Sequence, residues 1–245
     1  MKSIHLSVQL VAVFGTAVCI CAVPTLAQQC PEFVESLDLG CTALDVALSP
    51  GYAFVACDWG GLVVVDVADP SLPVVVGEEL LERAQHVAVI GEHAYVVRQS
   101  PTNMIPHGFN VVDIGTPDDP VWTGWLSLGW TAAPGVVAAT EGYAYVASGN
   151  EVLVIDVSDP YDPKPAGALT FSTDGEVKDV AVAEDHAYVL FDSVVNEHDG
   201  LYAFDWHPVK GRRNPIKDVK PFVIVRLDLV EIARALRGGE WTEVR

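Results

Sequence analysis

The sequence predicts an all-β fold built from repeats, and three observations carry that prediction. Two short apolar phrases recur four times at a constant spacing, a third apolar phrase ending in Asp follows each pair, and Asp-Pro steps come after most of these. The apolar runs have the length of strands rather than helices. Val, Ile, Tyr and Phe suit a pleated, packed surface. Because a fixed repeat determines the whole architecture, the repeat unit is the first feature to define.

Two valines that lie nine residues apart mark the first two phrases of each repeat. The pairs are Val46 and Val55, Val87 and Val96, Val137 and Val146, and Val180 and Val189. A few turn-forming residues, such as 49–51 and 90–92, separate the two phrases. Each pair of phrases therefore predicts a β-hairpin.

The third phrase and the turn after it predict two further strands. The phrase occupies residues 62–67, 109–114, 152–157 and, in a weaker form, 201–206. It is apolar at nearly every position, as expected of a strand packed on both faces. The Asp-Pro steps predict turns, because Asp bonds nearby backbone amides and Pro cannot continue a strand. One more apolar run follows each turn. We therefore predict a β-propeller of four recognisable four-stranded blade repeats, in a small or incomplete ring.

Residues 62–66 and 152–156, each closing into a Val-x-Asp-Pro turn, resemble the LVIVD repeat of bacterial and archaeal exported proteins. The resemblance covers about residues 33–206 and is most specific in the first three copies, because the fourth lacks the Asp-Pro turn. It implies a β-propeller and an extracellular or envelope setting. It implies no particular activity, because the family is defined by its scaffold.

The two ends of the chain bear on how the ring closes. Residues 32–39 resemble an outermost strand, and 222–229 is a candidate partner for it, so that one blade would mix both termini. Asp228 follows Asp205 by only 23 residues, so the tail supplies one strand rather than a fifth blade. A four-bladed ring, an open arc completed by dimerisation and part of a larger ring all stay open. Residues 230–245 form the C-terminal tail, and apolar spacing over 230–236 is compatible with a short helix.

Residues 1–27 have the pattern of a secretory signal peptide. Lys2 precedes an apolar stretch over 8–23, and the small residues Thr25 and Ala27 would precede cleavage before Gln28. No later segment approaches the 18 uninterrupted apolar residues of a membrane span. We therefore expect a mature chain without a transmembrane segment, with its propeller in 28–229. Its expected location is secreted, periplasmic or at the cell surface.

The charge distribution argues against nucleic acid as a partner. Of the 33 acidic residues, five lie from position 207 onward, so 28 precede it, against four basic residues between 28 and 206. The last 39 residues carry nine basic residues. A strongly acidic body repels phosphate backbones and favours weak cation binding.

The position before the first marked valine offers a candidate cation site. It holds Asp45, His86, Val136 and Asp179 in the four repeats. In a propeller this strand is the innermost, so Asp45, His86 and Asp179 could face one channel and bind Ca²⁺ or another divalent cation. The alternative is that they are polar residues hydrogen-bonded at the channel mouth, which the interruption at Val136 favours.

Two longer loops are candidates for partner contact. Residues 100–109 and 192–200 occupy the same position in the second and fourth repeats, so they are expected on one face of the ring. The polar residues singled out in and beside them are Asn103, His107, Asp192, Asn196, Glu197, His198 and Asp199.

Cysteine and tryptophan add two further expectations. After Gln28 the chain keeps Cys30, Cys41 and Cys57, which allow one disulfide and one free thiol, with all three pairings open. The neighbouring tryptophans at 122, 125 and 130 could line a sugar site. Alternation along a strand, however, predicts that Trp122 and Trp125 point to opposite faces, and packing between blades is their expected use.

No motif of an established catalytic class occurs: there is no Gly-x-Ser-x-Gly, no phosphate-binding Gly-rich loop and no His-Glu-x-x-His. We expect a binding or scaffolding module for protein or carbohydrate partners, and a homodimer if the ring is incomplete. The alternative is a cation-dependent hydrolase or lyase that uses an acidic central channel.

Overall fold

The computed structural model describes residues 33–100, 106–129, 134–171, 175–183, 186–193, 200–205 and 222–225. These residues form four antiparallel sheets of four strands each, which confirms the predicted all-β repeat fold. Each sheet is one blade, and its strands follow one another in chain order. No helix in the described part of the chain is long and apolar enough to cross a membrane.

The strand bounds follow the repeat. Blade 1 contains β1 (Asp45–Ser49), β2 (Tyr52–Ala56), β3 (Leu62–Asp66) and β4 (Val74–Glu79). Blade 2 contains β5 (Ala84–Ile90), β6 (His93–Arg98), β7 (His107–Asp113) and β8 (Val121–Gly129). Blade 3 contains β9 (Pro134–Thr140), β10 (Tyr143–Ser148), β11 (Glu151–Asp156) and β12 (Lys164–Thr170). Blade 4 contains β13 (Gly175–Ala183), β14 (His186–Ser193), β15 (Gly200–Asp205) and β16 (Phe222–Val225).

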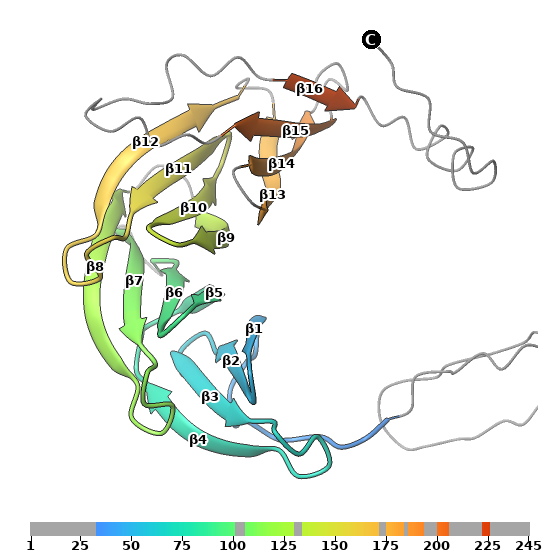
Figure 1. Cartoon of the computed structure of the whole chain (residues 1–245), viewed down its shortest axis with the longest axis vertical. Helices are drawn as coiled ribbons and strands as arrows, with labels where there is room; N and C mark the ends of the chain where they lie inside the picture. The colour runs from blue at the N-terminus through green and yellow to red at the C-terminus, as the bar shows by residue number, and fades with distance from the viewer. Residues whose placement is uncertain are drawn as a thin grey trace, which may run out of the picture.

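The blades are arranged along an open arc (Figure 1). The first strand of each blade lies on the concave side of the arc, and the fourth strands of blades 1 to 3 lie on the convex side. Blades 1 and 4 do not meet, so the described blades leave the ring open. The prediction of a small or incomplete ring is thus confirmed in its incomplete form.

Three apolar clusters hold neighbouring blades together. Phe54 and Leu62 of blade 1 pack with Val87 and Val96 of blade 2. Equivalent clusters join blade 2 to blade 3 and blade 3 to blade 4. The second and third strands of blade 2 are buried on both faces, because the blade contributes alternate side chains to the junction before it and to the junction after it.

The two ends of the chain do not form the expected mixed blade. β16 pairs with β15 and completes blade 4, so the tail does supply one strand. Residues 33–44 form no strand and cannot serve as its partner. Leu39 and Cys41 instead pack on an apolar cluster formed by β2 and β3 on the face of blade 1 that no other blade covers. Leu39 and Cys41 therefore form a partial cover for the first blade.

Candidate functional site

The register of the hairpins aligns the four repeats residue by residue. Each pair of marked valines is a directly opposed cross-strand pair: Val46 with Val55, Val87 with Val96, Val137 with Val146, and Val180 with Val189. The constant spacing in the sequence is therefore the constant register of four hairpins. Asp45, His86 and Asp179 occupy equivalent positions on β1, β5 and β13, the strands nearest the concave side.

Asp45 and His86 lie together at the junction of blades 1 and 2. The Oδ2 atom of Asp45 is 3.4 Å from Nδ1 of His86, and each side chain is about one-third exposed. The same Oδ2 accepts the backbone N–H of Val87 at 3.0 Å, while Oδ1 accepts that of Val46 at 2.9 Å. Partial burial opposes ionisation of Asp45, but the hydrogen bonds from His86, Val87 and Val46 outweigh it and lower the pKa of its carboxyl.

Asp179 does not join this pair. Its Oδ1 accepts the backbone N–H of Val180 at 2.8 Å, the same local bond that Asp45 makes. Because the arc is open, β13 of blade 4 does not face β1 of blade 1 across a closed channel. Within the described ranges no three His, Cys, Asp or Glu side chains lie close enough to hold a metal ion together. The structure thus brings together two of the three residues of the predicted cation site.

A second polar cluster, which the sequence did not reveal, lies beside the Asp45–His86 pair. Asp58, in the β2–β3 turn, forms an ion pair with Nε of Arg83 at 3.3 Å and accepts a hydrogen bond from the amide of Gln85 at 3.3 Å. The Arg83 guanidinium lies over the ring of Trp59, 5.4 Å from its centre. The sequence held one sign of this cluster: Arg83 is one of only four basic residues between positions 28 and 206, where acidic residues are abundant.

The backbone of this cluster is unusual. Asp58 and Arg83 have φ values of 37° and 59°, in the left-handed region that side chains other than Gly seldom adopt. The backbone oxygen of Asp58 accepts the N–H of Ala84 at 2.9 Å, which links the β2–β3 turn to the start of β5. Such conformations persist where surrounding contacts hold them, and they occur often at binding sites.

The two predicted contact loops are only partly described. His107, at the start of β7, accepts the backbone N–H of Ser100 on Nδ1 at 3.0 Å. Desolvation, followed by the charge of Arg98, lowers the pKa of His107. Asp192 near the end of β14 lies 3.8 Å from Nζ of Lys178, which also pairs with Glu176. The other five predicted contacts, Asn103, Asn196, Glu197, His198 and Asp199, lie outside the described residues.

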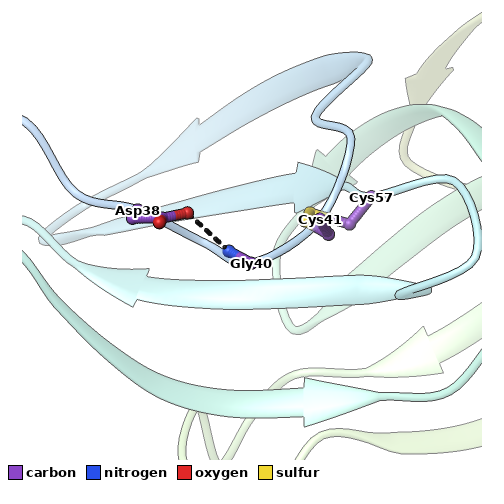
Figure 2. The surroundings of a disulfide bond; sticks show 4 residues. All are labelled: Asp38, Gly40, Cys41 and Cys57. Carbon is purple, nitrogen blue, oxygen red and sulfur yellow. Dashed lines mark hydrogen bonds between the residues drawn. A yellow bond between two sulfur atoms is a disulfide. The ribbon is translucent and has the colours of Figure 1, made fainter.

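The disulfide joins Cys41 to Cys57 (Figure 2). It attaches the segment before β1 to the end of β2, next to Asp58. Asp38 supports the approach of this segment, because its Oδ1 accepts the N–H of Gly40 at 2.9 Å. Cys30 lies outside the described residues.

The prediction that Trp122 and Trp125 of β8 point to opposite faces is wrong. The pairing of β7 with β8 shifts register between Val111 and Val112, which inserts one extra residue into β8. Trp122 consequently opposes Val112 and Trp125 opposes Asn110, two residues apart on one face of β7. The indoles therefore point to the same face, contrary to the simple alternation expected.

Both indoles are also accessible, rather than packed between blades. Trp122 is 50% exposed and Trp125 is 47% exposed. Their face of blade 2 is directed towards blade 1, because Val112 on the same face belongs to the apolar cluster shared with that blade. Glu79 of β4 lies beside them, and its Oε2 accepts the backbone N–H of Trp122 at 3.4 Å. Trp130 lies outside the described residues.

Among the solved structures that resemble the chain are two computationally designed proteins of low sequence identity. Ika8 is 8% identical, with a TM-score of 0.49, and the match covers 65% of this chain and 44% of Ika8, so the chain spans less than half of Ika8. Ika4 is 11% identical, with a TM-score of 0.53, and the match covers 72% of this chain and 99% of Ika4. The likeness to Ika4 concerns the fold alone. No curated protein matches the chain.

The family of the chain is shown by a match to a family model. The LVIVD repeat model matches residues 40–79, 83–124, 135–169 and 174–193, which together make up more than half of the chain. The first three matched ranges follow the first three blades, and the fourth covers β13 and β14 of blade 4. The chain belongs to the LVIVD-repeat family.

Proposed function

We propose that the protein is an exported binding and scaffolding module of the cell envelope, and that it holds a carbohydrate on the outer strand of blade 2. The observation that carries this proposal is the pair of half-exposed indoles of Trp122 and Trp125 on one face of β8. A bulge places them there, and bulges commonly re-aim side chains next to functional sites. Export is supported by the pattern of residues 1–27, which lie outside the described residues.

The chemistry of the indole pair suits a sugar. The face of an aromatic ring is electron-rich, so it attracts the weakly positive C–H groups that cover one side of a pyranose ring. Trp122 and Trp125 oppose residues two apart on β7, which separates their attachment points by about 7 Å along the strand. Two indoles at this spacing can stack against neighbouring units of an oligosaccharide chain.

A polar group that can bind hydroxyls lies beside the indoles, and a second polar side chain is buried behind them. The Glu79 carboxylate offers acceptor atoms at the Trp122 end of the pair. Asn110 lies directly across from Trp125, and its side chain is almost fully buried. Its Nδ2 has no acceptor among the residues that the structure describes. A buried amide donor without an acceptor is costly, but this atom is closed to solvent, so the Glu79 carboxylate is the flanking polar group that a sugar hydroxyl can reach.

The test compares tryptophan variants for retention on insoluble polysaccharides. Trp122→Ala and Trp125→Ala should each reduce retention on cellulose, chitin or peptidoglycan about two- to tenfold, since stacking on an aromatic ring contributes about 0.5–1.5 kcal/mol. Trp59→Ala is the matched control, because Trp59 is also exposed but lies on the β2–β3 turn of blade 1. It should leave retention unchanged. The proposal would be overturned if the wild-type chain bound none of the three polysaccharides. It would also be overturned if all three variants lost retention equally.

A further inference from the structure

On the inner strand of blade 1, one apolar side chain is exposed although its equivalents in the other three blades are buried. Val46 on β1 is 57% exposed. Its equivalents Val87, Val137 and Val180 are 5%, 6% and 4% exposed, each packed in the junction with the preceding blade. Leu48, two residues further along β1, is 73% exposed. Blade 1 therefore presents an apolar surface that matches half of a blade–blade junction.

Blade 4 exposes the opposite half of the same junction. Leu190 on β14 is 44% exposed. Its equivalents Ala56, Val97 and Ala147 are at most 2% exposed, each packed in the junction with the following blade. Leu190 also opposes Asp179 across the β13–β14 pair, so both belong to the face that a following blade would cover.

The contacts within the chain show which strands form a junction. β5 contacts β1 and β2, β9 contacts β5 and β6, and β13 contacts β9 and β10. Each junction is therefore the inner strand of one blade against the first two strands of the blade before it. The exposed side chains at the two ends lie on the corresponding strands, with Val46 and Leu48 on β1 and Leu190 on β14. The two ends are complementary halves of an interface that the chain already forms three times.

We propose that a second copy of the chain completes the arc, with β1 of each copy docked on β13 and β14 of the other. The interface is head to tail, and it is formed twice if two arcs close on each other. Two arcs of four blades give an eight-bladed ring, within the range known for propellers. Each copy then buries Val46, Leu48 and Leu190 in the way that the three internal junctions bury their equivalents.

The segment before β1 is compatible with this docking. Leu39 and Cys41 cover apolar side chains of β2 and β3, including Val55 and Val63. They leave Val46 and Leu48 of β1 uncovered. The strand that a junction requires is therefore free in the described part of the chain. The proposal does not depend on carbohydrate binding, because Trp122 and Trp125 lie on the outer strand of blade 2.

Sedimentation velocity over a range of concentrations tests the proposal. The wild-type chain should sediment as a dimer that dissociates on dilution. Leu48→Asp and Leu190→Asp should each sediment as a folded monomer, with unchanged circular dichroism because both side chains are exposed in the single chain. Leu72→Asp is the matched control: Leu72 is 69% exposed but lies in the outer Asp-Pro turn, and this variant should remain a dimer.

Mixing the two variants distinguishes a head-to-tail interface from a symmetric one. Leu48→Asp retains an intact β14 surface and Leu190→Asp retains an intact β1 surface, so an equimolar mixture should form a heterodimer through one intact junction. A symmetric contact of β1 with β1 would leave Leu190→Asp a dimer. A monomeric wild-type chain at every concentration, a dimeric Leu48→Asp variant, or no association in the mixture would overturn the proposal.

Discussion

The Oδ2 atom of Asp45 accepts the backbone N–H of Val87 at 3.0 Å, across the junction between the first two blades. The bond joins the inner strand β1 to the inner strand β5, and Nδ1 of His86 lies 3.4 Å from the same oxygen. The carboxylate thus serves as a link between blades. The sequence alone makes it a candidate cation ligand in a channel.

Replacing Asp45 should weaken this junction in a pH-dependent way. Because the folded-state pKa of Asp45 lies below its ordinary value of 3.8, its ionised form stabilises the fold fully above that value. The stabilisation is lost as pH falls through the lower folded-state pKa. Asp45→Asn should cost about 1 kcal/mol at pH 7, since the group is one-third exposed and solvent weakens the bonds. Urea unfolding at pH 7 and pH 3 checks this, and an equal cost at both values would contradict it.

Gly124 should resist substitution because of a close contact between blades. A Cβ atom there would overlap the backbone oxygen of Pro160, in the Asp-Pro turn of blade 3. Gly124→Ala should therefore destabilise the fold by about 2–3 kcal/mol through overpacking. Gly135→Ala is the matched control, because its Cβ would meet nothing closer than 3.8 Å. Thermal unfolding should show a lower Tm for the first variant only; equal Tm values would refute the contact.

The Cys41–Cys57 disulfide should stabilise the first blade. The bond closes a loop between residues 16 positions apart. For a loop of this size, restriction of the unfolded chain is worth about 3 kcal/mol. Cys41→Ser should lower the free energy of unfolding by that amount, and a reducing agent should destabilise the wild-type chain but not this variant. Peptide mapping should find Cys41 linked to Cys57, and a bridge to Cys30 would contradict the pairing.

Export can be checked on the expressed protein. If residues 1–27 are a signal peptide, the intact mass of the secreted chain should correspond to a start at Gln28. Replacing apolar residues between positions 8 and 23 with Asp should retain the protein inside the cell. Full-length protein in the external fraction would argue against cleavage at this position.

Much of the scaffold was predictable because it follows from local periodicity. The nine-residue spacing of Val46 and Val55 requires only a hairpin of fixed register, and the structure places these residues directly opposite each other. The candidate sites were less predictable, because they depend on contacts between blades. Asp58 and Arg83 are 25 positions apart and meet only once blade 2 has packed on blade 1. The indoles of Trp122 and Trp125 share a face only because of a bulge, and strict alternation cannot anticipate a one-residue shift.

The sequence by itself determined that the chain is a series of four-stranded units, since strand length, turn residues and repeat spacing are properties of neighbouring residues. Only the tertiary structure decided that β16 completes blade 4, that Cys41 pairs with Cys57, and that Asp179 lies away from Asp45 and His86. Ring closure depends on the angle between successive blades, which side-chain packing at each junction sets. Small differences accumulate over four blades, so the open arc and its exposed Val46 and Leu190 follow from packing and not from the repeat.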